Sequence, residues 1–202
     1  MELHFSREAI EFTRDLDNLD TFVIDFTSVL DEQKIEYVLM AGYVAILFGR
    51  NRTSEDVDIF IEKINAEKFK QLWEALSEKF ECLITASADE AFSEYLETSH
   101  AIRFSYKGKF IPNMEIKFPK VELDTWSLQH KQKVILNGKV LFISPIELQI
   151  AYKIFLGSEK GDKDLEDAKF LYDLFKDHLD HPLFLEFMRK LNIEEMFKKY
   201  IQ

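Results

Sequence analysis

Residues 40–58, MAGYVAILFGRNRTSEDVD, contain the stretch that decides the fold of this chain. The apolar run Tyr37–Met40 predicts a buried strand, and the small residues after it lead into one or two helical turns over residues 43–48. The segment Asp56–Ile61 then alternates between apolar and other side chains, which predicts a second strand. The sequence therefore predicts a strand, a turn of small residues, a short helix and another strand, in that order.

Two aspartates share one face of the second predicted strand. Asp56 and Asp58 lie on the face of Phe60, opposite an apolar face. Aspartate is depleted in strands, and two neighbouring carboxylates repel each other unless solvent, a basic partner or a divalent cation compensates them. Carboxylate pairs suit Mg²⁺ (or Mn²⁺), which usually completes its shell with water and substrate phosphate. The alternative, an acidic strand end that faces water, stays open from these residues alone.

The turn before the short helix offers an anion site. Gly42 lies fourteen residues before Asp56, at the predicted start of that helix. A turn of small residues there exposes backbone N–H groups and the positive end of the helix dipole, which together attract phosphate. Arg52 would add a charged fork to the same phosphates. One strand thus supplies metal ligands, and the preceding turn supplies the anion cradle.

With this turn, spacer and Asp-x-Asp strand, the sequence resembles the nucleotidyltransferase superfamily. Its motifs are most similar to those of the AbiEii-like branch, which reads Gly-Gly-Tyr-Ala and then Arg-x-Ser/Thr-x-Asp-hydrophobic-Asp. The resemblance implies that Gly42, Tyr43, Arg52 and Ser54 contribute to nucleotide binding. The sequence departs from the pattern in two ways: Ala41 replaces the first glycine, and no serine follows Gly42.

The resemblance also implies a third carboxylate on a later strand. Within residues 110–118, Glu115 is the candidate, because the alternation places it and Lys117 on the side of the site, with Met114 facing the core. Glu115 would share a metal with Asp56 and Asp58 or activate the acceptor hydroxyl. The alternative is a solvated strand face with two neighbouring exposed charges.

The resemblance continues into the last third of the chain. The AbiEii-like pattern Pro-Glu-x-x-x-Ala-x-Lys ends here on Lys153, and Lys-Asp-x-x-Asp corresponds to residues 163–167. Lys153, Lys163 and Asp164 would bind the nucleotide by closing over a triphosphate, with Asp164 and Asp167 orienting the basic groups. A solvated Lys153, and aspartates that serve only the helix dipole, are the alternatives left open.

Further elements follow from periodicity. Residues 19–34 and 65–79 have helical spacing of apolar side chains, and residues 81–85, 101–106 and 110–118 have the character of strands. We expect a hairpin across residues 107–109 and a second over residues 133–143 that turns at Asn137-Gly138. Ser144 is the expected N-cap of the next helix, with Pro145 in its first turn and Glu147 as the capping-box partner. The C-terminal third then reads as helices over residues 145–156, 162–176, 181–190 and 192–201, separated by Gly157, Gly161 and Pro182.

The predicted fold class is α/β (α+β): a nucleotidyltransferase fold with a mixed β-sheet flanked by helices and a C-terminal helical subdomain. Residues 1–143 would form the α/β domain and residues 144–202 the helical subdomain. The apolar stripe of the last two helices is mostly core, although it would also suit a second copy in a homodimer.

Composition limits the class of protein. The chain has 202 residues with 37 acidic and 26 basic side chains, and its formal net charge of −11 disfavours a broad grip on nucleic acid. RNA contact would need the four lysines of residues 107–120 to form a local groove. The lone Cys82 agrees with a reducing compartment, and no apolar run approaches the roughly 20 residues that span a bilayer. We therefore expect a soluble cytoplasmic protein that does not contact membranes.

The functional hypothesis is a nucleotidyltransferase that uses Mg²⁺ or Mn²⁺ to transfer a nucleoside monophosphate from an NTP to an acceptor hydroxyl. The resemblance implies the toxin half of a type IV toxin–antitoxin system, with RNA as the acceptor and a cognate antitoxin as partner. A small-molecule modifier, similar to aminoglycoside nucleotidyltransferases, differs only in its acceptor. The alternative from another class is a catalytically inactive nucleotide-binding or protein-interaction module on the same fold.

Overall fold

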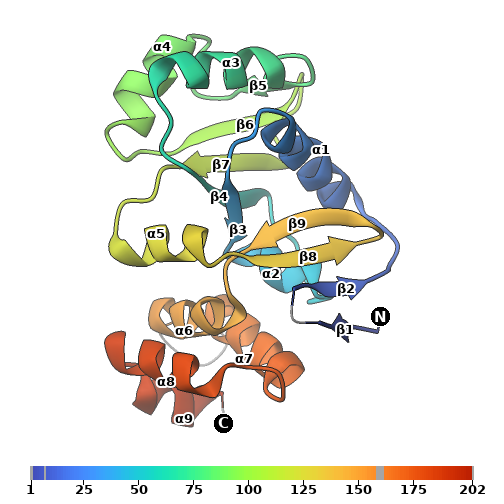
Figure 1. Ribbon diagram of the computed structural model, residues 1–202, viewed down its shortest axis with the longest axis vertical. Helices are drawn as coiled ribbons and strands as arrows, with labels where there is room; N and C mark the ends of the chain where they lie inside the picture. The colour runs from blue at the N-terminus through green and yellow to red at the C-terminus, as the bar shows by residue number, and fades with distance from the viewer. Residues whose placement is uncertain (1, 7, 158–161, 202) are drawn as a thin grey trace.

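The computed structural model describes residues 2–6, 8–157 and 162–201, and Figure 1 shows a twisted sheet with four C-terminal helices gathered at one end. Gly161, expected to separate two helices, lies outside the described residues. Within the described residues the strands are β1 (His4–Phe5), β2 (Ile10–Phe12), β3 (Tyr37–Met40), β4 (Asp56–Ile61), β5 (Phe80–Cys82), β6 (Ile102–Tyr106), β7 (Asn113–Lys117), β8 (Gln132–Leu136) and β9 (Lys139–Ile143). The helices there are α1 (Asn18–Glu32), α2 (Gly42–Leu47), α3 (Ala66–Leu76), α4 (Ala88–Glu90), the π-helix η1 (Ala91–Leu96), α5 (Glu122–Gln129), α6 (Ile146–Leu156), α7 (Lys163–Phe175), α8 (His181–Lys190) and α9 (Glu194–Tyr200).

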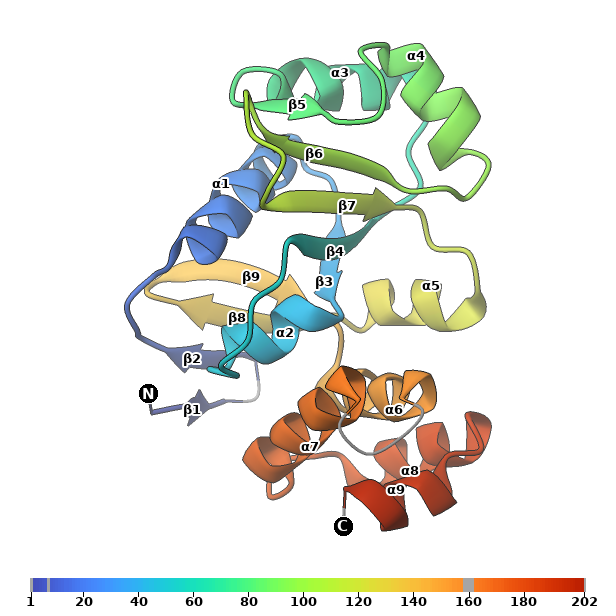
Figure 2. The ribbon, with the colours of Figure 1, turned by 180° about the vertical axis from the view of Figure 1, so that it is seen from behind.

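The described strands form one mixed sheet in the order β1-β2-β8-β9-β3-β4-β7-β6-β5. At its centre, β3 and β4 are antiparallel, β4 and β7 are parallel, and β7 and β6 are antiparallel. The predicted mixed sheet flanked by helices is therefore confirmed, as is the order strand, turn, helix, strand over residues 37–61. Figure 2 shows α2 lying between this sheet and the C-terminal helices.

The core packs aromatic side chains between the sheet and α1. Phe22 and Phe26 are fully buried on the inner face of this helix. Phe80 lies 5.8 Å from Phe22 and 5.0 Å from Phe26, measured between ring centroids, and both pairs meet edge to face. Asp17 caps the start of α1 by accepting a hydrogen bond from the Asp20 backbone N–H. The periodicity of residues 19–34 therefore identified both the helix and its buried face.

Both predicted hairpins are present. β8 and β9 pair in antiparallel fashion around Asn137 and Gly138, whose φ angles of +50° and +77° fit the residue types that favour tight hairpin turns. β6 and β7 also pair in antiparallel fashion, and the connection spans residues 107–112. Register is therefore fixed on both sides of the sheet by local turns.

The start of the C-terminal helical part differs from the prediction. Ser144 is not the N-cap of α6, which begins at Ile146 with Pro145 in the cap position and no side-chain cap. The backbone N–H of Ser144 instead donates to the Leu39 carbonyl at 2.8 Å and so continues the pairing with β3. Glu147 accepts a hydrogen bond from the Asp180 backbone N–H, which holds the connection before α8. The sheet therefore extends one residue beyond β9 before the chain turns into α6.

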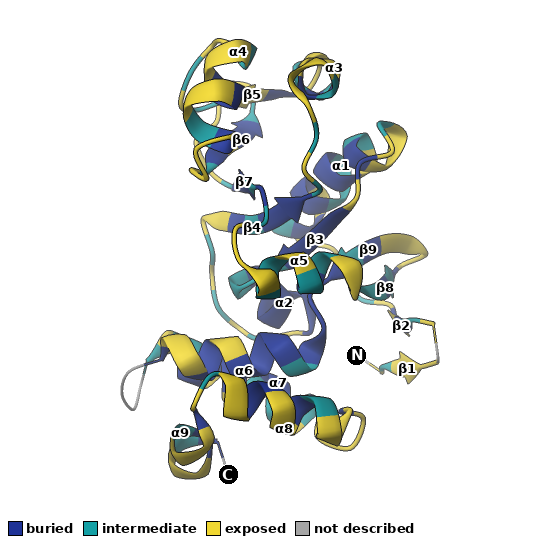
Figure 3. Ribbon diagram, turned by 60° about the vertical axis from the view of Figure 1, so that its left-hand side comes forward, coloured by how far each residue is buried: buried dark blue, intermediate teal, exposed yellow. Residues whose placement is uncertain are grey.

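Burial follows the layers. Figure 3 shows buried residues concentrated in the sheet and on the inner sides of α1, α2, α6 and α7, whereas α3, α4, α8 and α9 have exposed outer sides. The four predicted C-terminal helices are present as α6 to α9. Among the described residues, no helix is both long and apolar enough to cross a membrane.

Candidate active site

Three charged side chains form a row across the centre of the sheet. Parallel pairing of β4 and β7 sets Asp58 beside Glu115, and antiparallel pairing of β7 and β6 sets Glu115 beside Arg103. Side chains opposite each other in neighbouring strands lie on one face of a sheet, about 5 Å apart. The structure thus brings together two of the three carboxylates predicted from the sequence.

Lys117 lies between the two paired carboxylates. Its Nζ is 3.0 Å from Oδ1 of Asp58 and also contacts Oε1 of Glu115. Arg103 donates to the other oxygen of Glu115, at 2.8 Å from Nε and 2.6 Å from Nη2. Both oxygens of Glu115 therefore accept bonds from cationic groups.

The surroundings of Asp58 and Glu115 shift the pKa values of their carboxyl groups in opposite directions. Burial raises the pKa of Asp58, Lys117 opposes the rise, and the charges of Glu115 and Asp56 add to it. Burial also opposes ionisation of Glu115, but Lys117 and Arg103 outweigh it and bring the pKa of Glu115 below its usual value. Glu115 is thus a stabilised anion rather than a group prepared to take up a proton.

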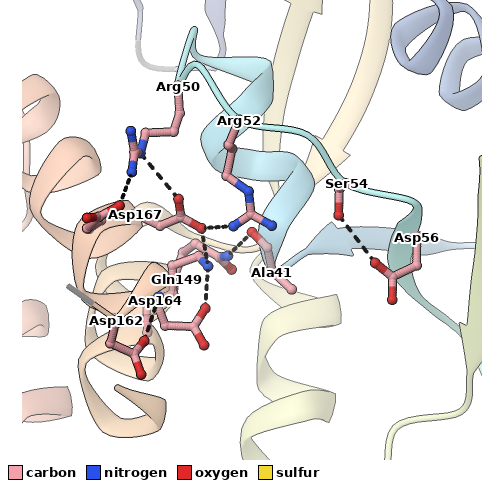
Figure 4. Close-up of polar contacts among 11 residues, drawn as sticks. Ala41, Arg50, Arg52, Ser54, Asp56, Gln149, Asp162, Asp164 and Asp167 are labelled. Atoms are coloured by element: carbon pink, nitrogen blue, oxygen red, sulfur yellow. Dashed lines mark hydrogen bonds and ion pairs between the residues drawn. The ribbon is translucent and has the colours of Figure 1, made fainter. Parts of the chain in front are cut away.

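Asp56 begins β4 on the same face as Asp58, and it is exposed. Its Oδ1 accepts a hydrogen bond of 3.2 Å from Oγ of Ser54. Figure 4 shows this pair lying apart from the ionic contacts around Asp167. Ser54 therefore orients a carboxylate, in addition to any contact with a nucleotide.

Two of the three predicted ligands, Asp56 and Asp58, are suited to bind a divalent cation. Asp56 and Asp58 offer hard oxygen ligands, and the raised pKa of Asp58 reflects a buried carboxylate for which an added cation would be favourable. Glu115 is engaged by two cationic side chains, and within residues 2–6, 8–157 and 162–201 no three His, Cys, Asp or Glu side chains are grouped to hold a metal ion. The fit thus concerns Asp56 and Asp58, without Glu115 as a third ligand in this arrangement.

A cavity of about 300 Å³ lies beside this row. Asp58 and Lys117 form part of its wall on the sheet side, and Lys153 and Asp164 form part of it on the helical side. Much of the remaining lining is apolar and comes from Met40, Phe60, Leu123, Leu148, Tyr152 and Leu156. Predicted site residues from β4, α6 and α7 therefore meet at one cavity.

A buried ionic cluster joins the helical end to the loop before β4. Asp167 is fully buried, and its Oδ2 contacts Nη1 of Arg52 and lies 2.8 Å from Nζ of Lys153. Lys153 also lies 2.9 Å from Oδ1 of Asp164, and Nε of Arg50 lies 3.5 Å from Oδ1 of Asp167. Figure 4 shows the two arginines reaching from this loop toward Asp167. Asp164 and Asp167 thus contact basic side chains, and a role for either aspartate in nucleotide binding stays a prediction.

The contacts of Arg52 differ from the predicted phosphate fork. Its side chain is only 10% exposed and is committed to Asp167. Gly42 makes room for it, because a Cβ on Gly42 would lie 2.8 Å from Nη2 of Arg52. Arg52 thus packs against Gly42 in the turn before α2, the turn that was expected to bind phosphate.

Tyr43 is a core residue. It has no exposed surface, and its hydroxyl donates to Oδ1 of Asp20 at 3.1 Å, beside the Arg14–Asp20 ion pair. Its predicted contact with nucleotide is therefore corrected, since this side chain of α2 belongs to the hydrophobic core and does not line the cavity.

Ala41 adopts a backbone conformation that favours glycine. Its φ is +56° and its ψ is −129°, and its carbonyl accepts a hydrogen bond of 2.8 Å from Nε2 of Gln149. The replaced glycine of the motif thus falls where glycine would relieve strain. Ala41 and Gln149 both line the cavity, so the strained turn is part of its wall.

The four lysines of residues 107–120 lie in two pairs, one at each end of β7, and their contact with RNA stays a prediction. Lys107 and Lys109 precede β7, whereas Lys117 and Lys120 come at its other end. A five-residue strand separates the two pairs by roughly 15 Å. Lys163 is exposed in the first turn of α7.

Several residues of the cavity were not predicted. The alternation of residues 113–117 had placed Lys117 on the correct face, but its ion pair with Asp58 depends on the pairing of β4 with β7, whose partners lie 57 positions apart in the chain. Leu123 and Ser127 come from α5, which was not predicted because its apolar side chains do not form a continuous face. Gln149 carries no sequence signal of its contact with Ala41.

The arrangement of sheet and helices is that of nucleotidyltransferase-like proteins. One similar structure is an antigenic nucleotidyltransferase-like protein from Paracoccidioides brasiliensis, with a TM-score of 0.53 and 19% identity over 89% of this chain and 92% of that chain. Another is the antibiotic-resistance factor ANT(2'')-Ia, with a TM-score of 0.55 and 11% identity over 89% of this chain and 96% of that chain. No protein-family model matches the sequence, and no curated protein gives a significant match. At such identities the likeness concerns the fold.

Proposed function

We propose that this protein is a metal-dependent nucleotidyltransferase. The observation that carries the proposal is the meeting of Asp58 and Lys117 with Lys153 and Asp164 around one cavity, on a fold shared with nucleotidyltransferase-like proteins. In the reaction, an acceptor hydroxyl oxygen forms a bond to the α-phosphorus of an NTP. The bond from the α-phosphorus to the oxygen that bridges to the β-phosphate breaks, pyrophosphate leaves with the electron pair, and the proton of the acceptor hydroxyl passes to solvent water.

Asp56 and Asp58 would hold Mg²⁺ or Mn²⁺, and Ser54 would keep Asp56 in place. When bound, the divalent cation supplies positive charge to the reacting phosphate and the leaving oxygen. Glu115 acts on the site by holding Lys117, with which it is in contact. Its expected role as a metal ligand or as a base toward the acceptor hydroxyl stays a prediction, and the lowered pKa of Glu115 makes it a weaker base.

The basic residues of the helical part complete the proposed nucleotide site. Lys153 is 3% exposed and lies between two aspartates, so it fixes the wall of the cavity opposite Asp58. Lys163 would reach the triphosphate from the first turn of α7, and Gly42 would offer its backbone beside Arg52. The apolar part of the cavity suits the nucleobase.

The AbiEii-like motifs support a finer proposal: a cytoplasmic toxin that acts on RNA and is opposed by an antitoxin. The formal net charge of −11 favours an acceptor that enters the cavity by one end, such as an RNA terminus or a small molecule, over a long RNA duplex. A homodimer is part of the same proposal.

The test is transfer of label from α-³²P NTPs to total RNA, to small-molecule acceptors and to the protein itself, with Mg²⁺ or Mn²⁺. We expect Asp56→Asn and Asp58→Asn each to reduce transfer by about 100-fold or more, as loss of a group acting on the transition state does. Asp89→Asn is the matched control, because this exposed aspartate belongs to α4, which Figure 1 shows at the opposite end of the molecule from α6 and α7.

Calorimetry with a non-hydrolysable NTP distinguishes an active transferase from a catalytically inactive nucleotide-binding module. Binding that needs Mg²⁺, with no transfer by the unmodified protein to any acceptor, would favour the inactive nucleotide-binding module. Full transfer by Asp58→Asn would contradict the proposed mechanism.

A further inference from the structure

The pairing of β4 and β7 creates an electrostatic problem that one lysine solves. Asp58 and Glu115 are direct partners in parallel strands, so their carboxylates face each other on one side of the sheet. Lys117 lies two residues beyond Glu115 on the same face, and its Nζ reaches both carboxylates. The ammonium group of Lys117 thus occupies the position between the two carboxylates that a metal cation could otherwise take.

The two carboxylates depend on Lys117 to different degrees. Glu115 has a second cationic partner in Arg103, which donates from both Nε and Nη2 to its Oε2. For Asp58, Lys117 is the cationic partner among the described residues. If Lys117 left, Glu115 would still be compensated, whereas Asp58 would need a replacement cation.

Lys117 has room to leave. Its side chain is 34% exposed, and it lines the cavity together with Asp58. The Asp58 side chain is 25% exposed, so an ion can approach it from the same side. The ion pair therefore lies at an accessible wall and not in the closed core.

From this geometry we infer that Lys117 is a built-in counter-ion that a divalent cation displaces from Asp58, releasing the ammonium group toward the cavity. The inference rests on the proposed function for the identity of the metal ligands. Lys117 acts here as a positioning residue that makes anion binding depend on prior cation binding.

The net charge of the site explains why the cation should bind before the anion. Three carboxylates, Asp56, Asp58 and Glu115, face two cationic side chains, Lys117 and Arg103, which leaves one excess negative charge. A divalent cation changes this to one excess positive charge. The released Lys117 then has a free donor for a phosphate or pyrophosphate group, which the negative site would have repelled.

The test measures Mn²⁺ binding to the full chain without nucleotide, from the electron paramagnetic resonance signal of free Mn²⁺ at pH 7 and constant ionic strength. We expect Lys117→Met to tighten Mn²⁺ binding about tenfold. Lys117→Arg retains the charge and should bind Mn²⁺ within about twofold of the unmodified protein. Lys120→Met is the control for general charge, because it removes an exposed lysine close to the end of β7, and it should change affinity less than twofold.

A second measurement uses the unmodified protein, so that it does not depend on the folding of a variant. The ¹⁵N signal of the Lys117 ammonium group, assigned by its loss in Lys117→Arg, should shift on titration with Mg²⁺. The signal of the buried Lys153 should remain in place.

The outcomes separate this inference from the proposed function. Equal Mn²⁺ affinity of Lys117→Met and Lys120→Met, with tight binding by the unmodified protein, would overturn the counter-ion role alone. If neither the unmodified protein nor Lys117→Met binds Mn²⁺ at millimolar concentration, the metal site and the counter-ion role both fail. Tighter binding by Lys117→Met in a protein that transfers no nucleotide would support the counter-ion role and contradict the transferase activity.

Discussion

Ala41 stands where β3 turns into α2, with a φ of +56° that side chains other than glycine rarely adopt. The sequence had marked this position only as a departure from a Gly-Gly pattern. The structure adds the reason why it matters, because the strained peptide borders the cavity and is held by Gln149. Strain of this kind persists where surrounding contacts fix the backbone.

Ala41→Gly should stabilise the protein. Removal of the Cβ relieves strain of roughly 1–3 kcal/mol, and the greater freedom of glycine in the unfolded chain offsets part of this gain. A net increase of about 1 kcal/mol in the free energy of unfolding would raise Tm by about 2–4 °C. Differential scanning calorimetry measures the shift.

Ala45→Gly is the matched control, because Ala45 is fully buried inside α2 and is in helical conformation. This change should lower the free energy of unfolding by about 1 kcal/mol. A lower Tm for both variants would mean that Ala41 carries no relievable strain.

At the scale of elements, α7 is attached to the rest of the protein through Asp167. This residue is fully buried and accepts contacts from Lys153, Arg52 and Arg50, which come from α6 and from the loop before β4. A buried carboxylate in this position compensates cationic groups that would otherwise repel one another. The cluster therefore holds three segments in one arrangement.

Asp167→Asn should lower the free energy of unfolding by about 3 kcal/mol, because it leaves buried cationic groups without their shared partner. Glu166→Gln is the matched control: Glu166 pairs with Arg50 from the next position but is 53% exposed. The exposed pair should contribute less than about 1 kcal/mol. Urea unfolding at pH 7 compares the two variants, and equal losses would refute the role of the buried cluster.

Strong periodicity decided which elements the sequence could predict. The helix over residues 19–34 and the strand Asp56–Ile61 have clear apolar faces, and both are present. In α5 the buried residue is Ser127, so no apolar stripe marks this helix. β1 and β2 are two and three residues long, too short for alternation to be visible.

The same limit applies to the candidate site. Asp56 and Asp58 could be found because their spacing along one strand is local. The contacts of Lys117 and Arg52 involve partners 59 and 115 residues away, and no local pattern encodes them. Tyr43 was assigned to nucleotide binding from its motif, although burial places it in the core.

At the scale of the whole molecule, the α/β part and the C-terminal helices are joined by direct contacts. α7 packs on α2, Gln149 of α6 binds the turn after β3, and the Asp167 cluster joins the two parts. The sequence boundary near residue 144 therefore marks a change of secondary structure between parts in close contact.

We expect a single cooperative unfolding transition. In calorimetry, the measured enthalpy should equal the van't Hoff enthalpy, as for a two-state protein. Two separate transitions, one for each side of residue 144, would contradict the coupling. Asp167→Asn should broaden the transition or split it, whereas Glu166→Gln should leave its shape unchanged.

The described sheet ends on very short strands, with two residues in β1 at one edge and three in β5 at the other. An open edge normally offers unpaired backbone groups to which another chain can add a strand. Here so few groups are available that each edge gives little template for fibril growth or for a continuous sheet between copies. Growth of the described sheet from either edge is therefore disfavoured, and contacts between copies would use side-chain surfaces rather than shared strands.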